Sequence, residues 1–582
     1  MTTATQPQAI APTRPESLPE TAPFQNDQRA YVEGFLAALQ SVRSAHDAAE
    51  AAANRGPGHP MTILYGSQSG NSESLAKSLR KHARNRGFDP EVKALDAVGP
   101  EALAEIEFLL IICSTFGEGD PPDNAKKFVD YIESDTATDL PTLRYSVCAL
   151  GDRSYTCFCR TGKVLDDRLA ELGATRLAPR VECDVDYDET YETWRDAVFA
   201  STPLADITEA AGAVLEDEPD TAAGPAEWSK AHPFPATMLR VQRLSGPGSA
   251  KEVNHVEISL AGSGLDYEVG DALGLWPVNC AADVEAILGA GGFTGEEVVT
   301  FKGEPYPLRA ALLRKVDLQV LTPVVREAMG LAVDDDWLRD RHLIDVLLDL
   351  APQVDAQALI DALRPLQPRL YSIASSPRAH PQQVQLTVGA VRYDLHGRPR
   401  KGVASTFLAE RCASGGTVGV YLQKSPHFRL PTDPMTPIVM VGPGTGIAPF
   451  RAFLEERLAG TSAGPSWLFF GDQHEASDYL YREWLEATHA GGGLSRLDLA
   501  WSRDGEEKVY VQHRMLAAGA ELFRWLEDGA HFYVCGDASR MAHDVDAALR
   551  RIVAEHGSMD AAAADAYIDR LAADHRYQRD VY

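Results

Sequence analysis

The sequence predicts a multidomain α/β protein, and three observations support this class. Near the N-terminus, three short apolar strands each run into a loop of small and polar residues, which indicates a doubly wound parallel sheet. In the middle of the chain, alternating strand patterns surround a block of helical pattern. Near the C-terminus, a strand leads into the string GPGTGIAPFR, a glycine-rich turn that opens a helix. A length of 582 residues suffices for about three or four such domains.

The composition limits the classes of function. Hydrophobic residues make up 45% of the chain and charged residues 24%, which is typical of a globular protein. The net charge of −29 disfavours a nucleic-acid partner and suits either a basic protein partner or simple solubility. The chain contains no run of about twenty apolar residues, no signal-peptide pattern and no C-x-x-C pair. We therefore expect a cytoplasmic protein with reduced thiols, no membrane anchor and no metal site.

The first 60 residues are expected to form a tether. Their start is rich in Pro and Thr, a composition typical of disorder. Residues 28–44 differ, because Tyr31, Phe35 and Leu39 recur at helical spacing and predict one amphipathic helix. Such a helix either docks on its own protein or binds another, and the sequence leaves both possibilities open.

The domain expected at residues 61–203 begins with an apolar strand that opens into a phosphate-binding loop. The strand Thr62–Tyr65 is followed by a Gly/Ser/Asn loop and a helix that begins near Ser72, so N–H groups, hydroxyls and the helix dipole converge on one anion. The loop is neither a Walker motif nor a G-x-G-x-x-G fingerprint, which favours a mononucleotide. The candidate residues are Ser67, Gln68, Ser69, Gly70, Asn71 and Ser72.

Two further strands of this domain, at residues 108–113 and 145–150, are followed by polar loops that are expected at the same edge of the sheet. Each loop carries an aromatic residue, Phe116 or Tyr155, that can cover the face of a ring. Ordinary strand-to-helix turns would explain one such loop but not three in register. The candidate residues are Ser114, Thr115, Phe116 and Gly117, followed by Leu150, Gly151, Asp152, Arg153, Ser154, Tyr155, Thr156, Cys157, Phe158 and Cys159.

A shift to Ala, Glu, Asp and Pro at residues 204–230 predicts a flexible acidic linker before the domain expected at 231–432. In that domain, Arg369 offers a fixed cation for a phosphate and Tyr371 offers a face for a flat ring. The later segment Gly402–Ser405 is small and hydroxylated before an apolar run, as at a helix start that binds a pyrophosphate. The alternative is an Arg-capped edge strand with a chance serine cluster. Residues 280–365 are mostly helical by pattern.

The domain expected at residues 433–582 carries a nucleotide platform in its glycine-rich turn. A later strand ends at Ser502 and Arg503, and Lys508 follows closely. A hydroxyl and two cations beyond a strand end suit the 2′-phosphate of NADP, whereas NAD-specific sites usually place an acid there. The alternative is a solvated Ser-Arg turn.

These motifs resemble known families. The three loops of the first domain resemble the flavodoxin family, and RLYSIASS resembles the FAD clamp of the ferredoxin-NADP reductase superfamily. The implied module order, a flavodoxin-like domain, an FAD-binding antiparallel β-barrel with a helical insertion and a C-terminal NADP-binding α/β domain, is similar to that of the diflavin reductases. The strings GDRSYTCFCRTGK, FRLP, GPGTGIAPFRAF, WSRD, YVCGDASRMA and RYQRDVY resemble the flavoprotein family of the bacterial NADPH-dependent sulfite reductases.

The resemblance implies three cofactors, FMN, FAD and NADPH. It implies that Ser372, Cys535 and Asp580 surround the hydride path and that Tyr582 stacks on the flavin; Cys535 would orient and not attack, because hydride transfer needs no covalent step. The implied FAD residues are Arg369, Leu370, Tyr371, Ser372, Thr387, Val388, Gly389, Tyr393, Gly402, Val403, Ala404, Ser405 and Tyr582. The implied NADPH residues are Gly444, Thr445, Ser502, Arg503, Lys508, Val509, Tyr510, Val511, Gln512 and Asp544.

The resemblance also implies a function and partners. Electrons would pass from NADPH through FAD and FMN to a separate sirohaem and iron–sulfur hemoprotein (beta) subunit that reduces sulfite to sulfide, in assimilatory sulfur metabolism and cysteine biosynthesis. The N-terminal region would assemble subunits, so a homo-oligomer is expected. One alternative is a soluble diflavin reductase for a cytochrome-type monooxygenase or other haem acceptor; Tyr582, where those enzymes usually carry Trp, argues against it. The other is a flavodoxin-like carrier or scaffold with a vestigial reductase half, against which Arg369 and Arg503 argue.

Overall fold

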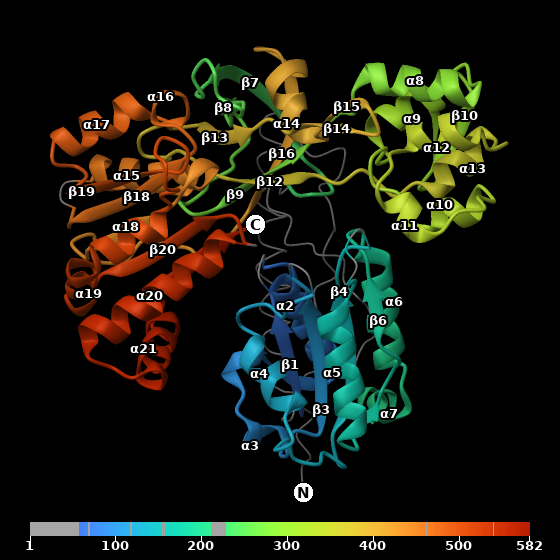
Figure 1. Cartoon of the computed structure of the whole chain (residues 1–582). Coiled ribbons are helices and arrows are strands. Elements are labelled where there is room, and N and C mark those ends of the chain that lie inside the picture. Colours follow the sequence, from blue (N-terminus) through green and yellow to red (C-terminus); the bar gives the residue numbers. More distant parts are fainter. Residues whose placement is uncertain are drawn as a thin grey trace, which may run out of the picture.

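The computed structural model describes residues 58–67, 70–116, 119–153, 155, 157–210, 228–460, 463–538 and 540–582. The expected helix at 28–44 and five candidate site residues, Gln68, Ser69, Gly117, Ser154 and Thr156, lie outside the described residues. Within them, no helix is long and apolar enough to cross a membrane, and no group of His, Cys, Asp or Glu side chains is arranged to hold a metal ion. Figure 1 shows three lobes around a central sheet.

The first domain is a doubly wound parallel sheet, as predicted. Its strand order is β2-β1-β3-β4-β5, with β6 paired to β4, which is the order typical of flavodoxin-like sheets. Because side chains alternate along a strand, Ile63 and Leu64 enter the cores on opposite faces of the sheet. The strands are β1 His59–Gly66, β2 Phe88–Ala94, β3 Phe108–Ser114, β4 Arg144–Leu150, β5 Thr175–Arg176 and β6 Val181–Cys183. The helices are α2 Asn71–Asn85, α3 Pro100–Leu103, α4 Lys126–Glu133, α5 Arg160–Glu171, α6 Asp188–Phe199 and α7 Thr202–Ala210.

The central sheet is antiparallel, with the order β12-β9-β16-β7-β8-β13. An isolated bridge between Ile373 and Leu386 joins the two end strands of this order, so the sheet curls toward a barrel. Its strands are β7 Phe234–Arg243, β8 Val253–Ser259, β9 Ala272–Trp276, β12 Arg369–Ser372, β13 Gln383–Gly389 and β16 Thr417–Gln423. The hairpin β14 Arg392–Leu395 and β15 Arg398–Lys401, the helix α14 Val403–Thr406 and a π-helical turn Phe407–Arg411 complete this part.

A helical block is inserted between β9 and β12 and has a hydrophobic core of its own. Its helices are α8 Ala281–Gly291, α9 Leu308–Arg314, α10 Pro323–Ala328, α11 Asp335–Arg339, α12 Leu343–Leu350 and α13 Ala356–Ala362. The block also contains a hairpin, β10 Val298–Phe301 and β11 Glu304–Pro307, that the helical pattern did not predict. Its turn residues Lys302 and Gly303 have φ values of 49° and 83°, the conformation of a tight hairpin turn.

The C-terminal domain is a parallel sheet with the order β19-β18-β17-β20-β21 and helices on both faces. Its last strand, β21, is an edge strand that pairs with β20. The strands are β17 Ile438–Val441, β18 Ser466–Asp472, β19 Arg496–Trp501, β20 His531–Gly536 and β21 Tyr577–Val581. The helices are α15 Ala448–Ala459, α16 Glu475–Asp478, α17 Arg482–Ala490, α18 Val511–Ala517, α19 Gly519–Glu527, α20 Met541–Gly557 and α21 Ala561–Ala573, preceded by the 3₁₀ turn Gly444–Ile447.

The segment expected to be a linker is more structured at its ends than its composition suggests. Helix α7 continues to Ala210, because Leu204 is buried against the core of the first domain. At the other end, the Trp228 indole N–H donates to the Ser263 carbonyl at 2.8 Å, so this residue already packs on the central sheet. Residues 211–227 lie outside the described ranges.

Candidate functional site

The loop between β1 and α2 meets the requirements of a phosphate site. Gly70, with φ of 82°, precedes α2 and lets the chain turn into the helix. The Ser67 N–H donates to Asn124 Oδ1 at 2.9 Å, which holds the loop against the neighbouring turn. The hydroxyls of Ser67 and Ser72 are buried and have no hydrogen-bond partner in the described structure. Buried hydroxyls without partners at a helix start are suited to phosphate oxygens, so the residues present fit the phosphate of FMN.

The other two loops lie beside this one at the carboxyl edge of the sheet. The Ser114 hydroxyl donates to the Gly66 carbonyl at 3.2 Å, and the Thr115 N–H donates to the Leu150 carbonyl at 2.9 Å. The structure therefore brings together the described candidates from all three strand ends. Tyr155 is 53% exposed, as expected of an aromatic residue offered to a ring, and Phe116 is half-buried.

Within the loop after β4, the cysteines and the charged residues have different surroundings. The Cys159 thiol is buried and points toward the Ala149 carbonyl at 3.4 Å, and burial raises its pKa to about 12. It is therefore a neutral packing group. Arg153 lies over the Phe158 ring at 4.6 Å, while the Asp152 carboxylate accepts from Arg364 of the inserted block at 3.0 Å.

The central sheet presents an anion cradle between β12 and α14. Arg369 Nη1 donates to the Gln367 carbonyl at 3.0 Å, and its Nε and Nη2 make no hydrogen bond within the described residues. A Cβ at Gly402 would lie 2.8 Å from Ser405 Oγ and 2.9 Å from Val391 Cβ, so this turn accepts only glycine without rearrangement. A cation with available donors opposite a close backbone turn fits the pyrophosphate of FAD.

Other residues expected along FAD already have protein partners. The Thr387 hydroxyl bonds to Tyr481 Oη at 2.8 Å, and Val388 is buried in the core of the central sheet. Tyr393 Oη bonds to His342 Nε2 at 2.9 Å, which links the β14–β15 hairpin to the inserted block. Tyr371 is half-buried, and burial raises its pKa to about 12, so the ring is neutral.

Three separate elements place a hydroxyl, a thiol and a carboxyl group together. The Ser372 hydroxyl at the end of β12 donates to Asp580 Oδ2 on β21 at 2.7 Å. The Cys535 thiol on β20 lies 3.8 Å from the same oxygen. Burial raises the pKa of the Cys535 thiol and of the Asp580 carboxyl, although Ser372 and Cys535 partly offset the effect on Asp580. The Cys535 thiol is therefore protonated, which suits a group that orients a bound ligand and does not attack it.

Tyr582 lies next to this trio and faces solvent. The residue is 61% exposed, and its Oη bonds to the Thr445 hydroxyl at 3.1 Å. Its backbone is held on both sides, since its N–H donates to the Gly536 carbonyl at 3.0 Å and its carbonyl accepts from Ala538 at 3.1 Å. A fixed backbone with an exposed ring allows the ring to move without unpairing the strand.

A cavity of about 700 Å³ extends from Tyr582 across the carboxyl edge of the C-terminal sheet. Two residues after Gly444, which lines the cavity, a Cβ at Gly446 would come within 2.1 Å of the Cys535 carbonyl, so the glycine-rich turn packs directly on β20. The candidates that line the cavity are Gly444, Thr445, Ser502, Arg503, Lys508, Val509, Tyr510, Val511, Gln512, Asp544 and Tyr582. All the expected NADPH residues are thus brought to one cavity large enough for an extended ligand.

The cavity also contains residues that the sequence did not indicate. Lys251 reaches in from the central sheet, and its Nζ lies 2.5 Å from Asp472 Oδ1. Asp472 ends β18, and Arg540 precedes α20 in the string YVCGDASRMA. The position of Asp472 at the end of a strand was a usable signal, whereas Lys251 belongs to another domain and no local motif indicates it.

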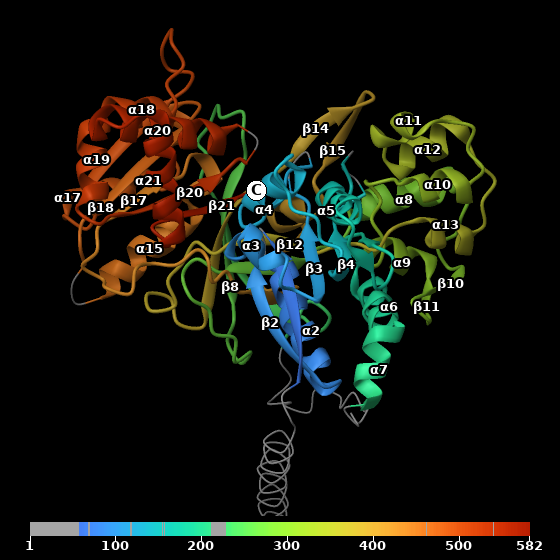
Figure 2. The same cartoon turned by 90° about the horizontal axis from the view of Figure 1, so that it is seen from below.

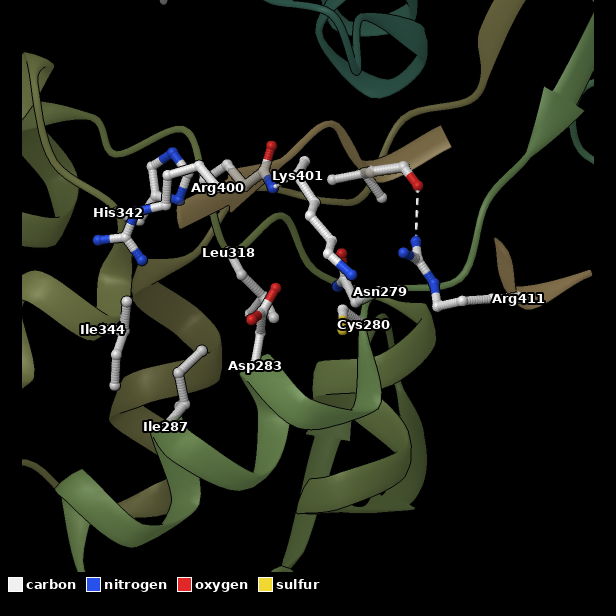
Figure 3. Close-up of a pocket in the computed structure, with 12 residues that line it drawn as sticks. Asn279, Cys280, Asp283, Ile287, Leu318, His342, Ile344, Arg400, Lys401 and Arg411 are labelled. Atoms are coloured by element: carbon white, nitrogen blue, oxygen red, sulfur yellow. Dashed lines mark hydrogen bonds between the residues drawn. The ribbon is translucent and has the colours of Figure 1, made fainter. Parts of the chain in front are cut away.

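A second cavity lies between the inserted block and the β14–β15 hairpin (Figure 3). It has a volume of only about 20 Å³, room for about one water molecule. Arg411 borders it and donates to the Val403 carbonyl at 2.8 Å. Its size excludes a nucleotide.

The first domain is docked on the other two through charged side chains. His427 Nε2 lies 3.1 Å from Glu73, Lys302 Nζ lies 2.7 Å from Asp186, and Arg579 Nε donates to Asp123 at 3.1 Å. In each of these pairs, as in Arg364–Asp152, the acid belongs to the first domain; Lys127–Asp569, at 3.0 Å, has the opposite polarity. Figures 1 and 2 both place the C-terminus next to the first domain.

Comparisons with known proteins agree with this arrangement. Residues 63–194 match the flavodoxin family model, residues 226–305 and 315–407 match the FAD binding domain, and residues 440–547 match the oxidoreductase NAD-binding domain. The chain is 44% identical over 583 residues to the sulfite reductase (NADPH) flavoprotein alpha-component of Bacillus subtilis strain 168, covering 95% of each chain. It is 41% identical to the proteins of the same name from Escherichia coli O1:K1, covering 100% of each, and from Shewanella sp. strain MR-7, covering 97% of this chain and 96% of the relative. The chain therefore belongs to the family of sulfite reductase (NADPH) flavoprotein alpha-components.

Proposed function

We propose that this chain is an NADPH-dependent diflavin oxidoreductase that passes electrons through FAD and FMN to a sirohaem and iron–sulfur hemoprotein, which reduces sulfite to sulfide. The observation that carries this proposal is the meeting of the Ser372, Cys535 and Asp580 side chains beside Tyr582, between the 700 Å³ cavity and the cradle at Arg369. When bound, the nicotinamide and the two flavins supply the hydride and electron transfer. The protein supplies binding, orientation and exclusion of water.

In this proposal, each group of residues has a distinct task. Arg503 and Lys508 bind the 2′-phosphate of NADPH with Ser502, because two cations and a hydroxyl give charge-assisted bonds to a phosphate. The Asp580 carboxylate holds the Ser372 hydroxyl and the Cys535 thiol toward the site of transfer. The Tyr582 ring covers that site and must move aside before a nicotinamide can lie there, which the fixed backbone on either side permits.

Delivery to the hemoprotein requires the first domain to leave its docked position. The Ala-, Glu-, Asp- and Pro-rich composition at residues 204–230 supports a flexible tether for this movement. The docking ion pairs include exposed ones, Lys302–Asp186 and Lys127–Asp569, and such pairs are individually weak enough to separate. The hemoprotein would then bind the acidic surface that faces the reductase domains in the docked arrangement.

The remaining assignments concern assembly and location. The amphipathic pattern at residues 28–44 supports a role of the N-terminal region in forming a homo-oligomer or in binding the hemoprotein. A cytoplasmic location is supported by the free cysteines of the described residues. We propose the domain boundaries 61–203, 231–432 and 433–582 on the basis of the three sheets and their cores.

The decisive experiment measures NADPH-dependent sulfide production by the full chain mixed with a sirohaem sulfite reductase hemoprotein. Sulfide that requires both proteins supports the proposal. Reduction of an artificial one-electron dye without any sulfide would leave the diflavin reductase in place and remove the hemoprotein as its acceptor. Failure to reduce the dye, with both flavins bound, would overturn the enzymatic function itself.

A further inference from the structure

Arg364 connects the inserted block to the loop that follows β4. It lies between α13 and β12, five residues before Arg369 of the anion cradle. Its carbonyl accepts from the Asp317 N–H at 2.9 Å, which fixes its backbone in the block. Its side chain crosses to the first domain, where Nη1 donates to Asp152 Oδ1 at 3.0 Å. One residue, placed between the inserted block and β12, thus contacts a candidate FMN loop.

The burial of this pair distinguishes it from the other ion pairs of the docking surface. The Arg364 side chain is 9% exposed and Asp152 is 28% exposed, whereas Lys302 and Asp186 are 59% and 32% exposed. The Arg364 Nε is buried and has no hydrogen-bond partner within the described structure. Burying a guanidinium with an unpaired donor lowers the free energy of unfolding. This pair is therefore poorly suited to serve only to hold the domains together. Because the Arg364–Asp152 pair is largely shielded from water, its charges interact more strongly with nearby charged groups.

Asp152 lies in one of the two loops between which the isoalloxazine ring of FMN is expected. It lies two residues after Leu150, which ends β4 and accepts from the Thr115 N–H of the neighbouring strand end at 2.9 Å. The Gly151 N–H donates to the Cys183 carbonyl at 2.9 Å, which anchors the loop just before Asp152. A carboxylate near an isoalloxazine ring disfavours the added negative charge of the reduced flavin, and a guanidinium bound to that carboxylate offsets the effect.

We propose that Arg364 is a positioning residue that neutralises Asp152 only while the first domain is docked, so that docking itself changes the FMN reduction potential. In the docked arrangement the Arg364–Asp152 pair favours electron uptake at FMN. Release of the first domain separates Asp152 from Arg364, which makes FMN a stronger reductant toward the acceptor. This inference rests on the proposed function, because it assigns FMN to the first domain and movement to that domain.

The test is a spectroelectrochemical titration of FMN in the full chain, at low and at high salt. In R364Q, we expect the FMN midpoint potential at low salt to shift to more negative values than in the unaltered chain. At high salt, where the docking ion pairs are screened, we expect the two potentials to converge. R364K keeps the charge but not the planar fork, so its potential should lie between the two. D152N should raise the potential at both salt concentrations, and adding R364Q to D152N should cause no further shift.

K302Q is the matched control. Lys302 also joins the inserted block to the first domain, at 2.7 Å from Asp186, but its partner does not lie in the loop after β4. We expect K302Q to leave the FMN potential at low salt closer to that of the unaltered chain than R364Q does. An equal shift in K302Q and R364Q would assign the effect to docking alone and overturn the proposal, as would an R364Q potential that does not change. If R364Q fails to retain FMN, D152N and R364K decide the question.

This titration uses neither NADPH nor the hemoprotein. Its outcome is therefore independent of the identity of the acceptor. A chain that produces no sulfide but shows the salt-dependent shift would refute the proposed acceptor and retain the role of Arg364. A chain that produces sulfide but shows no salt-dependent shift would support the proposed acceptor and refute the role of Arg364.

Discussion

Opposing effects act on the Asp580 carboxyl group. Burial raises its pKa, while the Ser372 hydroxyl, which donates at 2.7 Å, and the Cys535 thiol favour its charged form. Because the pKa is raised overall, the carboxylate takes up a proton at a higher pH than an exposed aspartate. An arrangement that needs this carboxylate to hold two donors therefore weakens as the pH falls through that raised pKa.

Replacing Asp580 with Asn should slow the reduction of FAD by NADPH by about 10- to 100-fold, because Ser372 and Cys535 lose the acceptor that orients them. Stopped-flow absorbance of the flavin measures the rate, and the same traces over an NADPH series give the affinity, which should change little. D546N is a matched control, since Asp546 accepts from Tyr577 Oη at the other end of the same strand. An unchanged rate in D580N would show that the trio is only structural.

Replacing Arg503 or Lys508 with Gln should reduce kcat/KM for NADPH by about 10- to 100-fold each, because each change removes a charge-assisted bond to the 2′-phosphate. The kcat/KM for NADH, which lacks the 2′-phosphate, should be nearly the same in the variants and the unaltered chain. NADH therefore serves as the internal control. Steady-state kinetics with an artificial one-electron acceptor give both numbers. A parallel loss with NADH would place these side chains elsewhere on the nucleotide.

At the residue scale, the sequence predicted the side chains that stand in contiguous motifs. Arg503 and Lys508 follow a strand end and reach the cavity together. The roles of Lys251 and Arg364 could not be predicted, because each side chain contacts a residue of another domain and no local sequence pattern indicates that contact. Cys159 stood in a motif, yet its thiol packs inside, since the loop turns with φ of 55° at that position.

At the scale of single elements, α12 is coupled to the β14–β15 hairpin through His342 and through Asp345, which accepts from Arg398 and Arg400. His342 precedes α12, is 8% exposed, and bonds to Tyr393 Oη. Burial and the Arg400 charge lower its pKa from 6.5 to about 4. The folded protein therefore keeps this ring neutral where an unfolded chain already binds a proton. The contribution to stability is complete above about pH 6.5 and declines as the pH falls toward about 4, by up to about 3 kcal/mol.

Replacing His342 with Asn should remove this pH dependence from the inserted block. Hydrogen exchange of the α12 amides, corrected for the intrinsic rate, should accelerate between pH 7 and pH 5 in the unaltered chain and much less in H342N. The exposed His396, on the same hairpin, provides the control H396N, which should behave like the unaltered chain. Equal acid sensitivity of α12 in H342N and the unaltered chain would rule out His342 as the cause.

The terminal strand β21 carries contacts to both other domains. Asp580 meets β12, Gln578 accepts from the Arg429 N–H at 2.7 Å, and Arg579 holds Asp123 of the first domain. Alternation along the strand directs Arg579 away from Gln578 and Asp580. The same strand therefore carries a contact that docks the first domain and Asp580, the carboxylate proposed to lie at the hydride site.

Reversing the charge in R579E should weaken docking and lower the rate of electron transfer from FAD to FMN at low salt by about tenfold, since a bidentate pair becomes a repulsion. The double variant D123R/R579E should recover part of the rate. Flash or stopped-flow measurement of FMN reduction in the full chain gives both values. K127E, which reverses a more exposed pair of the same surface, is the control with a smaller expected loss. No recovery in the double variant would contradict a direct pairing.

Elements were predictable where the pattern was long and uniform. The three strands of the first domain and the glycine-rich turn are of this kind. The β10–β11 hairpin was missed because its strands are only four residues each and lie within a helical pattern. The composition of residues 204–230, rich in Ala, Glu, Asp and Pro, predicts a linker, yet its start is helical in α7 because Leu204 and Ile207 pack on the first domain.

At the scale of the whole molecule, most ion pairs between the first domain and the reductase domains place the acid on the first domain and the cation on the reductase side. The chain has a net charge of −29, yet the reductase side presents Lys302, Arg364 and Arg579 to acids of the first domain. A partner that competes for that acidic surface needs cations in a similar spacing. If docking and delivery use this one surface in turn, as proposed, both should weaken as the ionic strength rises.

The insertion between β9 and β12 also affects how the chain reaches its structure. Trp276 ends β9 and Arg369 begins β12, so strands that pair side by side are separated by the whole helical block. Closing so long a connection by chance is entropically costly, but the block has its own core and can shorten it by folding first. We expect pulse-labelled amides of α8–α13 to gain protection before those of β9 and β12 during refolding. The central sheet would then be the last part to assemble, and its flavin cradle would be absent from any partly folded chain.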